Sequence, residues 1–146
     1  MKRMGPIVVL APVAVTVVSA QEVSEGTVQD AKAAEVVKTL EQRCSVIMFP
    51  EGTRSVDGRV GRFNDGAFHL AVKAGVPVLP VVVEGSHGCL PKKTWKFGPV
   101  DIRLEVLPPV PAGSDPIALR DSVRSAIIAK LAEWRRVSPV EVDGLR

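Results

Sequence analysis

The stretch that decides the fold is Ser45-Val46-Ile47-Met48-Phe49-Pro50-Glu51-Gly52-Thr53-Arg54-Ser55. Residues 45–49 are apolar enough to predict a short buried strand, which Pro50 ends. In the polar loop that follows, Gly52 lets the backbone turn and Arg54 offers a planar fork that suits a phosphate. Open α/β sheets bind ligands beyond the carboxyl ends of their strands, which is where this loop lies. A plain polar turn would have the same residues, so both interpretations stay open at this point.

Helical patterns lie on both sides of this stretch. A capping-box-like start at Thr27 and apolar residues at helical spacing predict a helix to about Arg43. After the loop, Asn64 or Asp65 can cap a second helix, and Gly75 is well placed to end it in the left-handed conformation.

Two more strands and a last helix follow. Residues 76–83 are apolar and β-branched, but two prolines cannot donate ladder hydrogen bonds, so this strand is expected to lie partly at an edge or to begin irregularly. Residues 101–107 alternate polar and apolar positions, which predicts a strand with one wet face. Asp115 and Pro116 open the last helix. Its predicted core stripe comprises Leu119, Val123, Ile127, Leu131 and Trp134.

This order of elements is typical of an α/β domain, here predicted as a mixed sheet flanked by helices. We divide the chain into an apolar N-terminal segment at residues 1–26, the α/β domain at residues 27–136, and a frayed tail at residues 137–146.

The N-terminal segment has two interpretations. The apolar run at residues 7–18 is rich in β-branched residues at 13–18, which fits a buried strand. Lys2 and Arg3 before it, and small residues near Ala20 after it, also fit a secretory signal. A membrane-spanning helix needs about 20 apolar residues, so the run is too short for one.

Composition narrows the range of partners. The 146 residues suffice for one domain, and a net charge of +3 suits a phosphorylated substrate or an anionic membrane. The sequence has no strong basic stripe of the kind that DNA-binding proteins use. Aromatic residues, at 4%, are too few to stack against the bases of a single-stranded nucleic acid. No nucleic-acid partner is therefore expected. Two cysteines and two histidines, with no C-x-x-C pair, predict neither a metal site nor a disulfide framework. Cys44 is expected to be a buried thiol.

The quoted stretch, together with later segments, resembles a known family. Residues 49–55 resemble a signature block of the lysophosphatidate and glycerol-3-phosphate acyltransferases. Residues 61–68, Gly61-Arg62-Phe63-Asn64-Asp65-Gly66-Ala67-Phe68, are similar to the stretch that links this block to the next helix. Residues 76–81 resemble the family's later apolar block, and residues 85–95 are also family-like. The resemblance covers roughly residues 28–106.

The resemblance implies acyl transfer from acyl-CoA or an acyl-carrier thioester, as co-substrate, to a hydroxyl of a glycerol-phosphate lipid in phospholipid biosynthesis. It implies no other cofactor and no metal. The substrate-binding residues implied are Phe49, Pro50, Glu51, Gly52, Thr53, Arg54 and Ser55. In that block Arg54 would hold the phosphate while Glu51, Gly52 and Thr53 shape the acceptor pocket.

The sequence departs from the family at the catalytic base. A hydroxyl attacks a thioester well when a histidine oriented by a carboxylate takes its proton, and the family supplies this pair as His-x-x-x-x-Asp. Five residues after His69 stands Ala74, and five after His87 stands Lys92, so the pair is absent here. We therefore expect a domain that is incomplete at its N-terminus or a degenerate relative. His87 is the one candidate for a replacement base, with a loop role as the plainer interpretation, and His69 is expected to be structural.

The segment Lys92-Lys93-Thr94-Trp95-Lys96-Phe97 mixes cations with aromatic rings, which suits a membrane interface as well as a solvated loop. We expect a peripheral location on the cytoplasmic face of a membrane. Two alternatives remain, a catalytically inactive fragment or remnant that binds phospholipid phosphate, and a secreted protein if residues 1–20 are a signal peptide.

Overall fold

The computed structural model describes residues 8–10, 27–42, 44–53, 55, 57–86 and 99–145, without the side chains before residue 34. Within these ranges the elements in chain order are β1 (Val8–Leu10), α1 (Thr27–Glu41), β2 (Val46–Met48), α2 (Gly66–Ala74), β3 (Val78–Glu84), β4 (Arg103–Val106), α3 (Pro116–Arg135) and α4 (Pro139–Val142).

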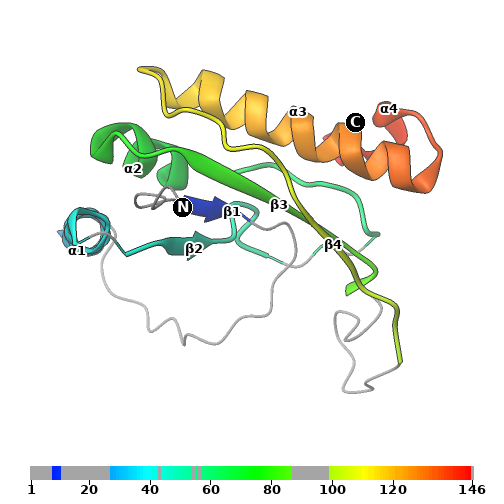
Figure 1. Cartoon of the computed structure of the whole chain (residues 1–146), viewed down its shortest axis with the longest axis horizontal. Coiled ribbons are helices and arrows are strands. Elements are labelled where there is room, and N and C mark those ends of the chain that lie inside the picture. The colour runs from blue at the N-terminus through cyan, green and yellow to red at the C-terminus, as the bar shows by residue number, and fades with distance from the viewer. Residues whose placement is uncertain are drawn as a thin grey trace, which may run out of the picture.

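The four strands form one mixed sheet, as predicted, in the order β2-β1-β3-β4 (Figure 1). Strand β1 runs parallel to both neighbours, and Val8–Leu10 pairs with Val46–Met48 on one side and with residues 78–80 on the other. Strand β4 pairs antiparallel with residues 81–84. Part of the N-terminal apolar run is therefore an internal strand, which supports the strand interpretation for residues 8–10. Residues 13–18, on which that prediction centred, lie outside the described ranges.

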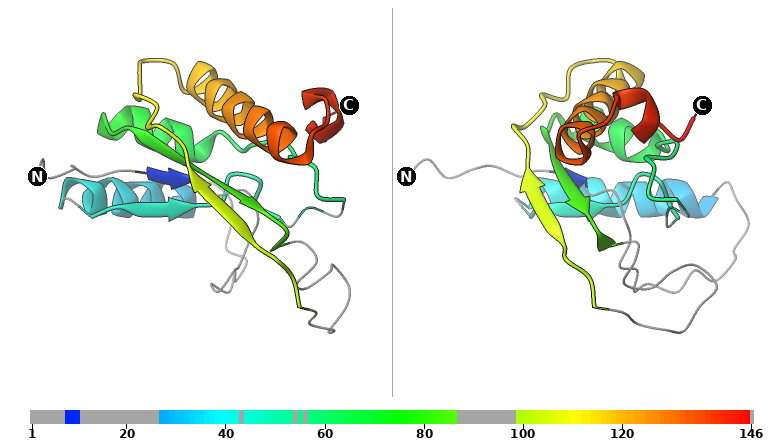
Figure 2. Two further views of the ribbon diagram at one scale, coloured as in Figure 1. Left: turned by 45° about the vertical axis from the view of Figure 1, so that its right-hand side comes forward. Right: turned by 90° about the vertical axis from the view of Figure 1, so that its right-hand side faces the viewer.

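The hydrophobic core lies between the sheet and one layer of helices. Helices α1, α2 and α3 all pack on the same side of the sheet (Figure 2). The core cluster joins Leu40 of α1, Phe68 of α2, Val82 of β3 and Ile127 of α3, each at most 1% exposed. The predicted stripe of α3 is confirmed, because its first four members are buried and Trp134 packs against the cluster.

Helix ends follow the predicted capping chemistry at two places. Gly75 ends α2 with φ of 63°, and its N–H donates to the carbonyls of Ala71 and Val72. At the start of α3, Asp115 Oδ1 accepts from Ile117 N at 2.8 Å, with Pro116 in the first turn. Asp65 stands at the N-cap of α2 but makes no side-chain cap.

The predicted buried strand at residues 45–49 is instead an edge strand. Among the described strands only β1 flanks β2, and Ile47 is 65% exposed on the face that the helices leave uncovered. Cys44 is exposed rather than buried, because it lies in the connection between α1 and β2, before the strand begins.

Strand β3, predicted to lie partly at an edge or to begin irregularly, is an internal strand of the sheet. It pairs with β1 at residues 78–80 and with β4 at residues 81–84, and it begins at Val78, after Pro77, instead of at Val76. Pro80 has no N–H to donate, but its carbonyl oxygen still accepts a hydrogen bond from Leu107 N at 2.9 Å.

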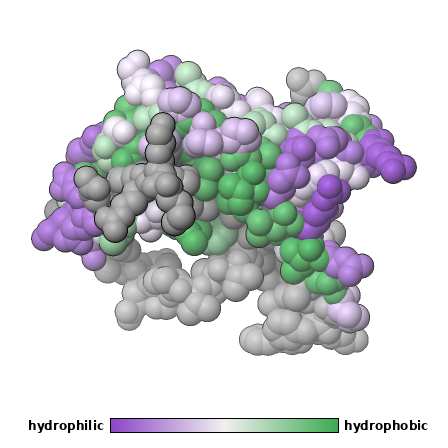
Figure 3. All heavy atoms as spheres, in the orientation of Figure 1, coloured by the Kyte–Doolittle hydropathy of each residue, from purple (hydrophilic) through white to green (hydrophobic). Residues whose placement is uncertain are grey.

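The polar face of β4, which was predicted to face solvent, instead faces α3. Its polar side chains face α3, where the Arg103 guanidinium lies 4.2 Å from the centre of the Trp134 ring and Glu105 pairs with Lys130 at 3.2 Å. Its apolar side chains, Leu104 and Val106, are 60% and 52% exposed. Figure 3 shows hydrophobic side chains gathered in this region of the surface.

The expected frayed tail after Val137 contains a packed helix. Ser138 and Glu141 form a capping box at the start of α4, and Val142 is fully buried. Val60 N donates to Val142 O at 2.9 Å, which ties the tail to the loop after β2. Among the described apolar side chains of the tail, that of Val142 is buried in the core while those of Val137, Val140 and Leu145 are exposed, so no repeating apolar pattern marks this helix in the sequence.

None of the helices in the described part of the chain combines the length and the apolar character needed to cross a membrane.

Candidate functional site

The loop after β2 begins with a tight turn. Gly52 N donates to Phe49 O at 3.1 Å, and Gly52 has φ of 65°. This left-handed conformation is costly for residues with a Cβ, which explains glycine at this position. Asn64 N donates to Pro50 O at 2.8 Å and holds the far end of the loop against the turn.

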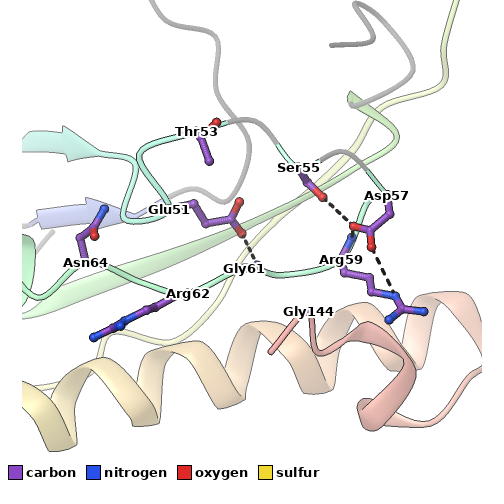
Figure 4. Close-up of a pocket in the computed structure, with 9 residues that line it drawn as sticks. All are labelled: Glu51, Thr53, Ser55, Asp57, Arg59, Gly61, Arg62, Asn64 and Gly144. Atoms are coloured by element: carbon purple, nitrogen blue, oxygen red, sulfur yellow. Dashed lines mark hydrogen bonds and ion pairs between the residues drawn. The ribbon is translucent and has the colours of Figure 1, made fainter. Parts of the chain in front are cut away.

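The loop folds back on itself and encloses a pocket of about 450 Å³ (Figure 4). Glu51 lies in the middle, with Arg62 and Asn64 at one end and Asp57 and Arg59 at the other. The pocket is lined by Glu51, Thr53, Ser55, Asp57, Arg59, Gly61, Arg62, Asn64 and Gly144.

Glu51 is the most enclosed acid of the pocket. Its Oε1 accepts from Gly61 N at 3.1 Å, ten residues along the chain. Burial raises the pKa of the Glu51 carboxyl, and the Gly61 hydrogen bond and the positive charge of Arg124 oppose that rise. Glu51 therefore braces the loop across the pocket with one of its oxygens.

Asp57 organises the other end of the pocket. Its Oδ1 accepts from Ser55 Oγ at 3.2 Å and from Arg59 N at 3.0 Å, and its Oδ2 lies 3.6 Å from Arg59 Nε. The bond from Arg59 N is the main reason that the pKa of Asp57 is lowered, so this exposed acid is ionised at neutral pH. The Ser55 hydroxyl is thereby directed at a carboxylate.

Arg62 brings a positive charge to the pocket. Its side chain is exposed, and no ion pair joins it to another residue within the described ranges. Arg59 at the opposite end pairs with Asp57, at a distance and exposure that make the pair weak. The pocket therefore has a cation at each end, and an anion can bind beside one of them.

Arginines of α3 hold the loop from outside. Arg124 Nε and Nη2 donate to Gly61 O and Val60 O at 2.9 and 2.8 Å. Arg135 Nη2 donates to Gly58 O at 2.8 Å and to Glu84 Oε2 at 2.7 Å. Arg120 pairs with Asp65 at 2.6 Å, and this partner explains why the Asp65 side chain does not cap α2.

Residues 5–84 match the model of the Acyltransferase family, which is more than half of the chain. The chain belongs to the acyltransferase family.

Individual relatives agree with this assignment. A 1-acyl-sn-glycerol-3-phosphate acyltransferase from Limnanthes alba is 43% identical over 83 residues, which are 57% of this chain and 29% of the relative. The alpha form of 1-acyl-sn-glycerol-3-phosphate acyltransferase from Homo sapiens is 40% identical over 105 residues, which are 68% of this chain and 37% of the relative.

A solved structure shares the fold. The crystal structure of the 1-acyl-sn-glycerophosphate (LPA) acyltransferase PlsC from Thermotoga maritima matches with a TM-score of 0.66 and 37% identity. The match covers 70% of this chain and 44% of that protein. This acyltransferase-family chain thus spans less than half the length of the relatives named here.

The structure brings together part of the predicted acyltransferase block. Glu51, Thr53 and Ser55 line the pocket, and Gly52 makes the turn beside it. Phe49, 38% exposed, and Pro50, which is buried, do not line it.

Two predicted residues lie outside the described ranges, Arg54 and the candidate base His87. The segment 92–97 lies outside them as well. His69, expected to be structural, has an exposed side chain on α2.

Sequence reasoning missed the arginines of α3 and the contribution of Gly144. A signal for the arginines exists, because positions 120, 124 and 135 fall on one face of a helix with 3.6 residues per turn. Gly144 offers no side-chain signal, and it reaches the pocket only because α4 turns the chain back toward Val60.

Proposed function

We propose that this acyltransferase-family chain binds the glycerol-phosphate headgroup of a 1-acyl-sn-glycerol 3-phosphate, the acceptor in acyl transfer. The observation that carries the proposal is the pocket itself, because polar residues of the family-like block and two arginines line one space at the carboxyl end of β2. Relatives whose names specify this acceptor support the same conclusion.

The chemistry of the pocket suits a phosphate monoester. Arginine forks form paired, charge-assisted hydrogen bonds to phosphate oxygens, and we assign this role to Arg54, with Arg59 and Arg62 adding positive charge. Ionised Asp57 at the pocket rim disfavours an anion nearby, so we place the phosphate toward Arg62. Glu51 and Thr53 would then face the glycerol hydroxyls.

Acyl transfer is proposed for the whole protein. The free hydroxyl oxygen of the acceptor attacks the carbonyl carbon of acyl-CoA or an acyl-carrier thioester, the new C–O bond forms as the C–S bond breaks, and the hydroxyl proton ends on the departing thiol. This step needs a general base, and these 146 residues hold no His-x-x-x-x-Asp pair. For the residues of this chain the proposal is acceptor binding, with His87 the candidate base if the chain transfers acyl groups alone.

A second candidate function is phospholipid-phosphate binding without transfer. The missing pair within these 146 residues is the observation that favours it. It shares the pocket and Arg54 with the first candidate and differs in predicting no turnover of an acyl thioester.

Isothermal titration calorimetry with sn-glycerol 3-phosphate tests the shared claim. We expect binding by the wild-type chain, loss of at least about tenfold in affinity in Arg54→Ala, and no change in Lys73→Ala. Lys73 is an exposed cation in the last turn of α2 and does not line the pocket. Equal affinity in wild type and Arg54→Ala would contradict the assignment of the phosphate site.

Release of free thiol from an acyl-CoA in the presence of lysophosphatidate separates the two candidates. Turnover by the 146-residue chain, abolished in His87→Ala, would support transfer by this chain. Headgroup binding without thiol release would support the binding function.

A further inference from the structure

Arg124 joins three separate parts of the chain at one point. From α3, its guanidinium donates to the carbonyls of Val60 and Gly61 and pairs with Asp143 Oδ1 at 2.6 Å. The Arg124 side chain is 12% exposed and that of Asp143 is 19% exposed. A charge pair this enclosed has a fixed geometry, because little water competes for its hydrogen bonds.

The contact passes directly to the pocket. The carbonyl of Gly61 accepts from Arg124 Nε, while the amide of the same residue donates to Glu51 Oε1 at 3.1 Å. Gly61 is thus held from both sides of the backbone, by an arginine outside the pocket and by a glutamate inside it. A shift of Gly61 would move the Glu51 carboxylate with it.

Asp143 extends this arrangement to the pocket wall. Gly144, the next residue, lines the pocket, and its N–H donates to Val60 O at 3.0 Å. A Cβ at residue 144 would lie 3.0 Å from Val60 O and 3.3 Å from Arg59 Cβ, so the close approach requires glycine. The C-terminal segment therefore supplies one wall, and Val60 O accepts from both Gly144 N and Arg124 Nη2.

We infer that Arg124 is a positioning residue for the acceptor pocket: paired with Asp143, it fixes the Val60–Gly61 backbone from which Glu51 is held. This inference rests on the proposed function. The role belongs to the guanidinium fork and not to positive charge alone, because two nitrogens contact three oxygens. The charge of Arg124 also opposes the upward effect of burial on the pKa of Glu51.

Two variants test the role without removing the side chain outright. Arg124→Lys keeps the charge but loses the fork, and Asp143→Asn keeps an oxygen acceptor but loses the charge. Lys130→Ala is the matched control. Lys130 lies on the same helix as Arg124, and its replacement removes ion pairs to Glu105 and Glu133 that lie away from the pocket. Thermal unfolding of each variant identifies the temperature range in which all are folded, and comparisons are made there.

The first readout is hydrogen exchange of the Gly61 amide, which needs no ligand. We expect exchange at least about tenfold faster in Arg124→Lys than in wild type, because the amide loses its fixed position against Glu51. We expect no such change at Gly61 in Lys130→Ala. Unchanged protection in Arg124→Lys, or equal acceleration in the control, would overturn the inference.

The second readout is the dissociation constant for sn-glycerol 3-phosphate. We expect an increase of about tenfold in Arg124→Lys and in Asp143→Asn, and a much smaller effect of Arg124→Lys when Glu51 is already alanine. Additive effects in that double variant would show that Arg124 acts on overall stability and would overturn the inference. Absence of binding by the wild-type chain would instead overturn the proposed function, and the Gly61 exchange rate alone would then decide whether Arg124 holds the loop.

Discussion

The glycine that makes the turn beside the pocket offers a test of both the loop geometry and its function. Gly52 has φ of 65°, and a Cβ there would lie 3.0 Å from Asn64 Nδ2. The left-handed conformation costs a residue with a Cβ about 1–2 kcal/mol. The contact adds little to this, because Asn64 is exposed and its amide end can rotate away. We therefore expect Gly52→Ala to lower the free energy of unfolding by about 1–2 kcal/mol.

Two other glycines isolate the cause. Gly113 has φ of 62° with nothing near its Cβ position, so Gly113→Ala should cost about as much as Gly52→Ala. Gly66 starts α2 with no positive φ and an open Cβ position, so Gly66→Ala should be neutral or stabilise the fold by up to about 1 kcal/mol. Urea denaturation followed by tryptophan fluorescence measures all three. Affinity for sn-glycerol 3-phosphate should fall in Gly52→Ala alone, because of the three glycines only Gly52 lies in the turn beside the pocket.

The reasoning would be refuted if Gly52→Ala unfolded at the same urea concentration as Gly66→Ala. Equal losses of stability in Gly52→Ala and Gly113→Ala, with unchanged headgroup affinity in both, would confirm the backbone strain and contradict the place of the turn in the site.

Three further predictions follow from the same contacts. Burial raises the pKa of the Glu51 carboxyl in the folded chain. As the pH rises from about 4.3, Glu51 therefore loses its carboxyl proton in the unfolded chain before it does so in the folded chain. The free energy of unfolding falls over this range until the pH has passed the folded pKa. Glu51→Gln should remove that fall, measured by urea denaturation at a series of pH values, and a wild type that gains stability relative to the variant across this window would contradict it. Arg135→Ala removes two hydrogen bonds to Glu84 and one to Gly58 O, and the side chains of Arg135 and Glu84 are each about a quarter exposed. We expect it to lower the free energy of unfolding by about 1–2 kcal/mol. The control Glu133→Ala, at an exposed side chain, should lower it by less than about 0.5 kcal/mol. If the protein works at a membrane surface, replacing Lys92, Lys93 and Lys96 by Gln should weaken sedimentation with phosphatidylserine vesicles at low salt by about 1 kcal/mol per lysine, and unchanged binding would count against that location.

Local chemistry explains what could be predicted from the sequence. Gly75 and the Asp115–Pro116 pair end and begin helices through contacts within a few residues, so their patterns are visible in a short window. The stripe of α3 was predictable for the same reason, since burial repeats every turn. The loop after β2 was predicted to be a site from its residue types together with the family resemblance, and the structure places Glu51, Thr53 and Ser55 around one pocket.

Contacts between distant residues explain the rest. Arg124 and its carbonyl partners are 63 and 64 positions apart, and no local pattern reports such a pair. The missing N–H of Pro80 favours an edge position in the sequence. In the structure the Pro80 carbonyl still accepts a hydrogen bond from the distant Leu107, and β3 lies between β1 and β4. Cysteine is a residue type that is common in protein cores, yet β2 starts two positions after Cys44 and the thiol is exposed to solvent.

The most direct test of the central claim is a titration of the 15N-labelled chain with sn-glycerol 3-phosphate, followed by amide chemical shifts. The account predicts saturable shifts at Gly52, Thr53, Gly61 and Gly144, which lie in the turn and around the pocket, with the amides of α1 and β4 unmoved. Shifts centred on any other part of the molecule, or none at millimolar ligand, would contradict a headgroup site in this loop.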